Sequence, residues 1–186
     1  MADRGLTGVL LVGGASRRFG SPKALATLKG ETLADRAWRT LGEISDERLA
    51  VGKAEDGLEL PFPLLDDGSE VRAPIAGVVA GLRAARHEVV VVLPVDCPLV
   101  TGAELQALAA ACADAAVPAS GPLPGAYRRT ALPALERALA AGELALHAVL
   151  REIETRTVAL DPARLVNVNT REELARLAGT CPEASV

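Results

Sequence analysis

The segment EVVVVLPVD, from Glu88 to Asp96, constrains the fold of this chain more than any other stretch. Four valines and a leucine follow one another without polar alternation, so neither face of this strand is expected to lie in water. An uninterrupted apolar run rich in β-branched residues is typical of a central strand in a parallel sheet covered by helices on both faces. We therefore expect Glu88–Leu93 to lie inside such a sheet.

Similar apolar segments recur along the chain, and helical patterns separate them. The other expected strands are Gly8–Val12, Arg48–Val51, Pro63–Leu65 and Ala115–Pro118. Expected helix starts are Thr32 ahead of Ala34–Leu41, Pro74 ahead of Ile75–Ala85, and capping boxes at Thr101 and Thr170. This alternation predicts a three-layer α/β/α domain of Rossmann-like type with a mostly parallel central sheet.

Size and charge limit the number of domains and the kind of ligand. A chain of 186 residues that is 49% hydrophobic can bury one core and is short for two complete domains. A formal net charge of -4 argues against a nucleic-acid-binding surface, which needs a broad basic face. We expect one domain over residues 1–186, a small ligand, and a disordered polar tail from about residue 178.

Cysteine usage and hydropathy indicate the compartment. Cys97, Cys112 and Cys181 are an odd number without CxxC spacing, so neither a disulfide framework nor a structural zinc site is expected. No apolar run approaches the roughly 18 residues that span a bilayer, and the first residues lack the apolar core of a signal peptide. These features predict a cytoplasmic protein without a membrane partner.

A glycine-rich, positively charged segment follows the first expected strand. Gly13 to Lys23 reads GGASRRFGSPK and includes Arg17 and Arg18. Glycines let backbone N–H groups approach phosphate oxygens, and ligands of such sheets lie at the carboxyl ends of the strands. The glycine spacing fits neither a Walker A loop nor a dinucleotide fingerprint. A nucleoside triphosphate is the expected ligand.

Asp96 follows the central strand and is therefore expected at the same edge of the sheet. One carboxylate together with substrate phosphates is a usual arrangement for holding Mg²⁺. The alternative is that Asp96 caps the next helix, but Thr101 is a better cap for that helix.

Four segments are similar to those of one known family. They are LVGGASRRFGSPKAL from Leu11, Asp96-Cys-Pro, APIAGVVAGL from Ala73 and LVNVNTREEL from Leu165. Together they resemble nucleotidyltransferases of the molybdenum cofactor guanylyltransferase type, called MobA, and the resemblance extends from Gly8 to Leu177. The first two segments are shared with cytidylyl- and sugar-phosphate nucleotidyltransferases, whereas N-V-N-T is the most specific element.

The resemblance implies roles for individual residues. Lys23 matches a phosphate-binding lysine and Asp96 the magnesium-binding aspartate, and with Arg17 they form the expected catalytic group. The expected nucleotide-binding residues are Leu11, Val12, Gly13, Gly14, Arg18, Lys23, Asp67 and Asp96, with Asp66 as a competitor for Asp67. Asn167 and Asn169 match the asparagines on the pterin side, although Asn169 could equally cap a helix.

The implied reaction transfers GMP from GTP to the terminal phosphate of molybdenum-molybdopterin and releases pyrophosphate. The nucleophile is already an anion, so His87 and His147 are expected to be structural. Transient contact with molybdoenzymes or cofactor-insertion proteins is a further implication. A cytidylyltransferase, another nucleotidyltransferase and a non-catalytic nucleotide-binding protein remain alternatives.

The sequence departs from the family at the point that bears on base selectivity. Gly52 or Lys53 stands where the family has an asparagine that helps to recognise guanine. Lysine can donate to a base but cannot accept from guanine N1–H, so the missing contact could come from main-chain carbonyls of Leu11 to Gly13. The choice between GTP and CTP therefore stays open at the level of sequence.

Overall fold

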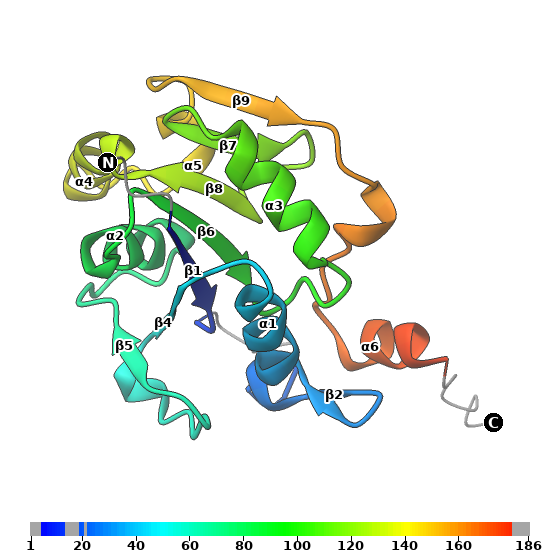
Figure 1. Ribbon diagram of the computed structural model, residues 1–186. Helices are drawn as coiled ribbons and strands as arrows, with labels where there is room; N and C mark the ends of the chain where they lie inside the picture. The colour runs from blue at the N-terminus through cyan, green and yellow to red at the C-terminus, as the bar shows by residue number, and fades with distance from the viewer. Residues whose placement is uncertain (1–4, 14–18, 21, 180–186) are drawn as a thin grey trace.

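A seven-stranded sheet forms the centre of the protein (Figure 1). The computed structural model describes residues 5–13, 19, 20 and 22–179. The strand order is β5-β4-β1-β6-β8-β7-β9. The strands are β1 (Leu6–Leu11), β4 (Glu47–Gly52), β5 (Leu64–Asp66), β6 (Val89–Pro94), β7 (Ala115–Pro118), β8 (Gly125–Arg128) and β9 (Thr155–Val158).

β6 occupies the middle of the sheet, as its apolar run predicts. It pairs in parallel with β1, and β1 and β4 continue the parallel pairing towards β5. Val91 and Leu93 of β6 pack into one hydrophobic core, while Val90 and Val92 pack into a second. Both faces of this strand are therefore covered, which is why polar alternation is missing.

Two strands of the sheet were not expected from the sequence. β8 runs antiparallel to both β6 and β7, and β9 lies parallel to β7 at the edge. β8 is four residues long and begins with a glycine, so it lacks the apolar run that marks the other central strands. The sheet is consequently parallel on the β5 side of β6 and mixed beyond it.

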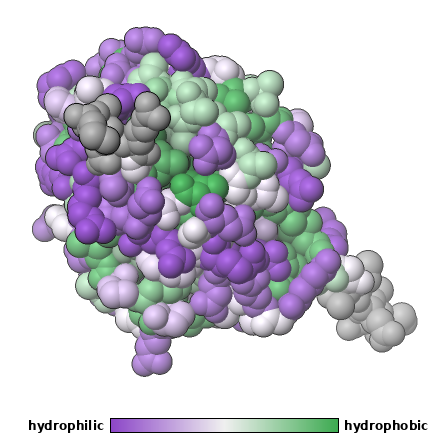
Figure 2. Space-filling model, in the orientation of Figure 1, coloured by the Kyte–Doolittle hydropathy of each residue, from purple (hydrophilic) through white to green (hydrophobic). Residues whose placement is uncertain are grey.

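Helices cover both faces and complete the three-layer α/β/α architecture. They are α1 (Leu33–Gly42), α2 (Pro74–Ala84), α3 (Gly102–Ala111), α4 (Leu132–Ala140), α5 (Leu146–Val149) and α6 (Arg171–Ala178). α1, α3 and α6 contribute to the first core, and α2, α4 and α5 to the second. On the face shown in Figure 2, apolar side chains gather where α3, rich in alanine and leucine, covers the sheet.

The expected helix starts are confirmed. Thr32 Oγ1 accepts from Asp35 N at 3.0 Å, and Pro74 opens α2. In the capping box of α6, Glu173 N donates to Thr170 Oγ1 at 3.1 Å while Glu173 Oε2 accepts from Thr170 N at 3.1 Å. α6 includes Ala178, and the rest of the expected tail, residues 180–186, lies outside the described residues.

Short elements join the main ones. β2 (Thr27–Leu28) and β3 (Glu31–Thr32) form a two-stranded antiparallel ribbon, and 3₁₀ helices occupy Lys23–Leu25, Ala54–Asp56, Arg129–Ala131 and Pro162–Arg164. Across the described ranges, no helix has both the length and the apolar character to cross a membrane.

Candidate active site

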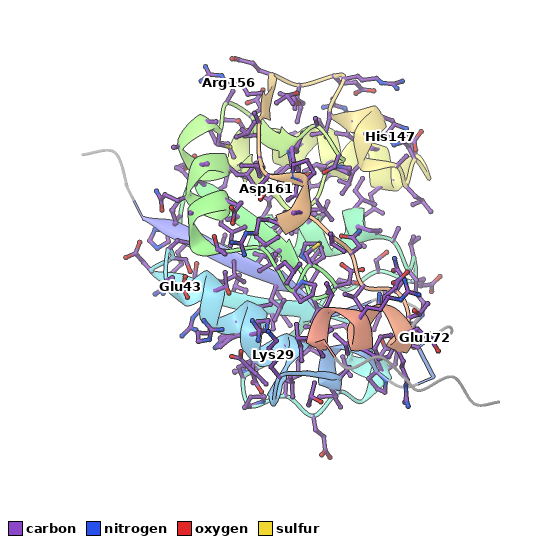
Figure 3. The ribbon with its side chains drawn as sticks, turned by 90° about the vertical axis from the view of Figure 1, so that its right-hand side faces the viewer. Lys29, Glu43, His147, Arg156, Asp161 and Glu172 are labelled. Carbon is purple, nitrogen blue, oxygen red and sulfur yellow. The ribbon has the colours of Figure 1, made fainter. Side chains whose placement is uncertain are left out.

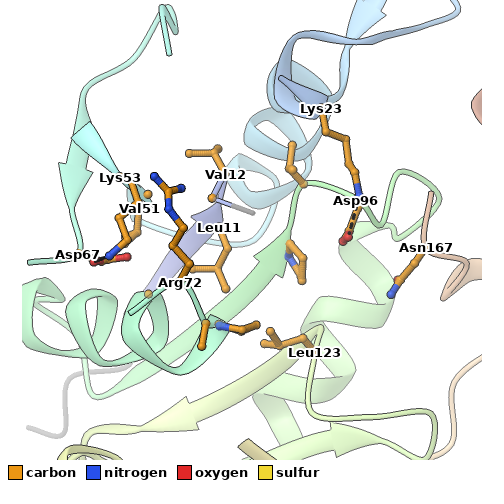
Figure 4. Close-up of a pocket in the computed structure, with 17 residues that line it drawn as sticks. Leu11, Val12, Lys23, Val51, Lys53, Asp67, Arg72, Asp96, Leu123 and Asn167 are labelled. Carbon is orange, nitrogen blue, oxygen red and sulfur yellow. Dashed lines mark hydrogen bonds and ion pairs between the residues drawn. The ribbon is translucent and has the colours of Figure 1, made fainter. Parts of the chain in front are cut away.

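A cleft of about 330 Å³ opens at the carboxyl ends of β1, β4 and β6 (Figure 4). Residues 11–13, 51–53 and 94–96 line it from the strand ends. The lining is completed by residues 72–74 and Gly77, at and just before the beginning of α2, and by Lys23, Asp67, Leu123 and Asn167. A close approach of α2 to the sheet shapes its floor, because a Cβ at Gly77 would lie 2.8 Å from Leu11 Cδ2. The cleft has the position expected for the ligand.

Lys23 and Asp96 meet at one end of this cleft. Lys23 Nζ lies 3.3 Å from Asp96 Oδ2 and donates to Asn169 Oδ1 at 3.2 Å. The side chains of Lys23 and Asp96 are 14% and 26% exposed, so both are partly shielded from water and still reachable by a ligand. The glycine-rich segment and the central strand thus contribute to one site.

The N-V-N-T segment lies directly against Asp96. Val168, which is fully buried, donates its N–H to the main-chain carbonyl of Asp96 at 2.8 Å. This anchor places Asn167 and Asn169 on either side of it, and Asn167 Oδ1 accepts from Cys97 Sγ at 3.0 Å. Two asparagines far along the chain from Asp96 therefore border the same end of the cleft.

The structure does not support the alternative that Asn169 or Asp96 caps a helix. Thr170 is the N-cap of α6, which leaves the Asn169 side chain to Lys23. Thr101 is the N-cap of α3, and Glu104 Oε2 accepts from Thr101 N at 2.9 Å. Asp96 lies in a turn ahead of that helix and caps nothing there.

At the other end of the cleft, the structure separates Asp67 from Asp66. Asp67 lines the cleft and pairs with Lys53, whose Nζ is 2.7 Å from Asp67 Oδ1. Asp66 is exposed and accepts from the backbone N–H groups of Ala54 and Gly68, which hold its pKa below the ordinary value. Of these two aspartates, only Asp67 lines the cleft.

The remaining expected residues divide into two groups. Leu11, Val12 and Gly13 line the cleft, and the Leu11 carbonyl already accepts from Val95 N at 3.0 Å. Gly14, Arg17 and Arg18 lie outside the described residues. The roles assigned to all of these residues stay predictions.

Sequence reasoning did not include Lys53, Arg72 and Leu123 among the candidate site residues, yet all three line the cleft. Lys53 had a usable signal, because it is one of three lysines in the chain and directly follows a strand. Arg72 and Leu123 lie in connecting segments without a comparable pattern.

Among the described residues that line the cleft, none resembles a prepared side-chain nucleophile. Burial, the nearby Asp96 charge and a hydrogen bond to it raise the pKa of the Cys97 thiol far above its ordinary value. His87 precedes β6 at the opposite edge of the sheet, and His147 lies on α5, away from α6 (Figure 3). The arrangement suits a reaction in which substrates supply the nucleophile.

The oxygen atoms of Asp96, Asn167 and Asn169 are suitable ligands for a hard divalent cation. A carboxylate and two amide groups are the oxygen ligands that Mg²⁺ accepts. No group of three or more His, Cys, Asp or Glu side chains able to hold a metal occurs within the described ranges. A cation here would therefore need phosphate oxygens or water to complete its coordination.

The family model described as the MobA-like NTP transferase domain matches residues 8–158. The chain belongs to this family. The resemblance carried by the glycine-rich segment and Asp96-Cys-Pro is thereby confirmed, whereas N-V-N-T lies beyond the residues that this model matches.

The sequences of relatives in the MobA-like family align with nearly the whole chain. A molybdenum cofactor guanylyltransferase of Desulfosudis oleivorans is 32% identical, over 92% of this chain and 93% of that protein. One of Pseudomonas putida is 35% identical, over 89% of this chain and 94% of that protein.

Solved structures agree with the fold. Molybdopterin-guanine dinucleotide biosynthesis protein A from Archaeoglobus fulgidus aligns with a TM-score of 0.78 at 25% identity, over 93% of this chain and 97% of that one. The 2-C-methyl-D-erythritol 4-phosphate cytidylyltransferase of Thermus thermophilus has the same fold, with a TM-score of 0.72 at 20% identity over 92% and 96% of the two chains. The MobA-like fold is thus shared by enzymes that use different nucleotides.

Proposed function

We propose that this chain is a molybdenum cofactor guanylyltransferase, which transfers GMP from GTP to the terminal phosphate of molybdenum-molybdopterin and releases pyrophosphate. Curated relatives with this name are 32% to 35% identical over at least 89% of the chain. The observation that supports it most is that Lys23, Asp96 and Asn169 meet within 3.3 Å at the carboxyl edge of the sheet.

In this reaction an oxygen of the pterin phosphate forms a bond to the α-phosphorus of GTP. The bond from that phosphorus to the oxygen bridging to the β-phosphate breaks, and pyrophosphate leaves with the electron pair. No proton has to be removed from a weak nucleophile. The site must instead hold two anions together and offset the charge that develops on the phosphoryl oxygens.

Lys23 suits the phosphate chain of GTP. Its side chain is only 14% exposed, and this shielding strengthens its interaction with an anion relative to open water. Asp96 and Asn169 hold the Lys23 ammonium at the cleft. Arg17 and Arg18 are proposed to add positive charge to the same phosphates.

Asp96 is proposed to hold Mg²⁺ together with phosphate oxygens of the nucleotide. When bound, the cation would supply positive charge close to the α-phosphate. Asn167 and Asn169 are proposed to orient the pterin substrate, and their position beside Asp96 at one end of the cleft supports this role. We also propose that the enzyme works in the cytoplasm and passes its product on through transient contact with molybdoenzymes or cofactor-insertion proteins.

Pyrophosphate release with Mg²⁺ and molybdenum-molybdopterin, compared between GTP and CTP, tests this function. We expect release with GTP that depends on the pterin substrate. Release only with CTP would identify a cytidylyltransferase instead. Tight nucleotide binding without any release would identify a non-catalytic nucleotide-binding protein.

A further inference from the structure

Lys53 and Asp67 form a buried ion pair at the end of the cleft opposite Lys23 and Asp96 (Figure 4). Lys53 follows β4 and Asp67 follows β5, and these parallel neighbours bring the two side chains together. The distance from Lys53 Nζ to Asp67 Oδ1 is 2.7 Å, and the side chains are 7% and 8% exposed. Lys53 Nζ also donates to the main-chain carbonyl of Ser69.

Stability does not explain why this pair is present. The cost of removing two charges from water offsets much of their attraction, so an apolar pair of similar volume is often as stable. Within the described ranges, Lys53 is also the one charged residue that is buried as a whole, at 5% exposed. A buried charge that lines a cleft is a frequent property of functional sites.

The position of the pair indicates which part of a nucleotide it meets. Phosphates belong at the Lys23 end, where the cation lies beside a carboxylate that can share a metal. The wall between the two ends is apolar and is formed by Leu11, Pro74 and Gly77 among others. A nucleotide that binds along this wall with its phosphates at the Lys23 end places its base beside Lys53 and Asp67.

The hydrogen bonds around Asp67 determine what it can offer to a base. Oδ1 accepts from Lys53 Nζ and from Ser69 N at 2.9 Å, so its two lone pairs are used. No donor within the described ranges is paired with Oδ2. This oxygen can therefore accept from two neighbouring donors, whereas a neighbouring acceptor would be repelled.

Guanine is the base whose edge meets this requirement. Its N1–H and 2-amino group are adjacent donors that can converge on one carboxylate oxygen. Adenine and cytosine place a ring acceptor beside their amino group, and hypoxanthine lacks the amino group altogether. A site built around fixed hydrogen-bonding groups rejects bases that leave those groups unpaired.

We propose that Lys53 is a positioning residue that determines base specificity by holding the Asp67 carboxylate in an orientation in which Oδ2 faces guanine N1–H and the 2-amino group. The inference rests on the proposed function. Arg72 lies at the same end, but its guanidinium is bound to Glu55 and Asp56 at 2.6 and 2.9 Å, which makes Lys53 the cation that controls Asp67.

Equilibrium binding of GTP, ITP, ATP and CTP with Mg²⁺ tests the proposal in Lys53→Met, in Asp67→Asn and in the double variant Lys53→Met/Asp67→Leu. The double variant removes both charges, so no unpaired charge is left buried. It therefore provides the binding measurement if Lys53→Met does not fold. Lys29→Met is the matched control, because Lys29 is exposed and lies outside the cleft.

We expect wild type and Lys29→Met to prefer GTP over ITP, ATP and CTP. The preference should fall about tenfold or more in the other variants, because hydrogen bonds to a charged group are lost. In turnover assays KM for GTP should rise while kcat changes little, since the base is remote from the α-phosphorus. An unchanged preference in Lys53→Met, or in the double variant, would overturn this inference without touching the proposed function. Failure of the wild type to bind any nucleotide would overturn both.

Discussion

Lys23 Nζ lies 3.3 Å from Asp96 Oδ2, although 73 positions separate the two residues in the chain. Parallel pairing of β1 with β6 produces this contact, because the segments that follow both strands emerge at the same edge. The sheet therefore places Lys23, which we propose binds phosphate, beside the carboxylate that we propose shares a divalent metal with the phosphates.

Replacing Asp96 should abolish turnover and leave the fold intact. Asp96→Ala removes the carboxylate proposed to hold Mg²⁺, and the loss of a key electrostatic group lowers kcat about a hundredfold or more. Initial rates of pyrophosphate release measure the effect, and circular dichroism reports the fold. Asp161→Asn is the control, because Asp161 is exposed and asparagine also caps the helical turn after it. Full activity of Asp96→Ala with magnesium would refute the assignment.

Replacing Lys23 should weaken the interaction with the phosphate chain. Lys23→Ala is expected to raise the Kd for GTP about tenfold or more, because a charge-assisted contact in a shielded site is lost. Isothermal titration with GTP and with guanosine separates the phosphate from the base, since guanosine binding should not change. Lys29→Ala provides the same substitution at an exposed lysine (Figure 3). An equal loss for GTP and guanosine would assign Lys23 a structural role instead.

Asn169 and Thr170 are neighbours with separable roles. Asn169→Ala removes a partner of Lys23 but leaves the α6 cap in place, so activity should fall while the melting temperature stays close to wild type. Thr170→Ala removes the cap and should lower the free energy of unfolding by about 1 kcal/mol with smaller effects on activity. Urea unfolding and steady-state rates on both variants test this. The reverse pattern would show that Asn169 acts as a helix cap.

We predict that Glu47 makes the free energy of unfolding depend on pH in the acidic range. Burial raises the pKa of Glu47, but hydrogen bonds from Arg86 N, Thr7 Oγ1 and Arg86 Nε outweigh it, so the folded pKa lies below 4.5. A depressed carboxyl pKa gives stability that is present above the unfolded value and lost as pH falls through the folded value. Glu47→Gln should therefore destabilise the protein by about 1–3 kcal/mol at pH 7.

Urea unfolding at several pH values measures this linkage. The difference between wild type and Glu47→Gln should narrow as pH falls below 4.5. A difference that stays constant down to pH 3 would show that the ionised carboxylate is not responsible. Glu47 lies at the amino-terminal part of the sheet, so GTP binding should be unchanged at pH 7.

The sequence predicts the parallel half of the sheet because each of its strands has an apolar segment of its own. Lys23, Asp96 and the asparagines are likewise predictable, since they follow strands or belong to a recognisable motif. β8 is harder to foresee, because Gly125–Arg128 is short and is stabilised by its neighbours rather than by its own pattern. The Lys53–Asp67 pair depends on the pairing of β4 with β5, which local sequence does not reveal.

Transfer of label from GTP carrying ³²P at the α-phosphate tests the central claim most directly. The protein is incubated with this GTP, Mg²⁺ and molybdenum-molybdopterin, and the pterin product is separated from the nucleotides. We predict that the label enters a pterin–guanine dinucleotide in an amount equal to the pyrophosphate released, and that Asp96→Ala prevents both. Pyrophosphate release with the label recovered only in GMP, or no release at all, would contradict the account.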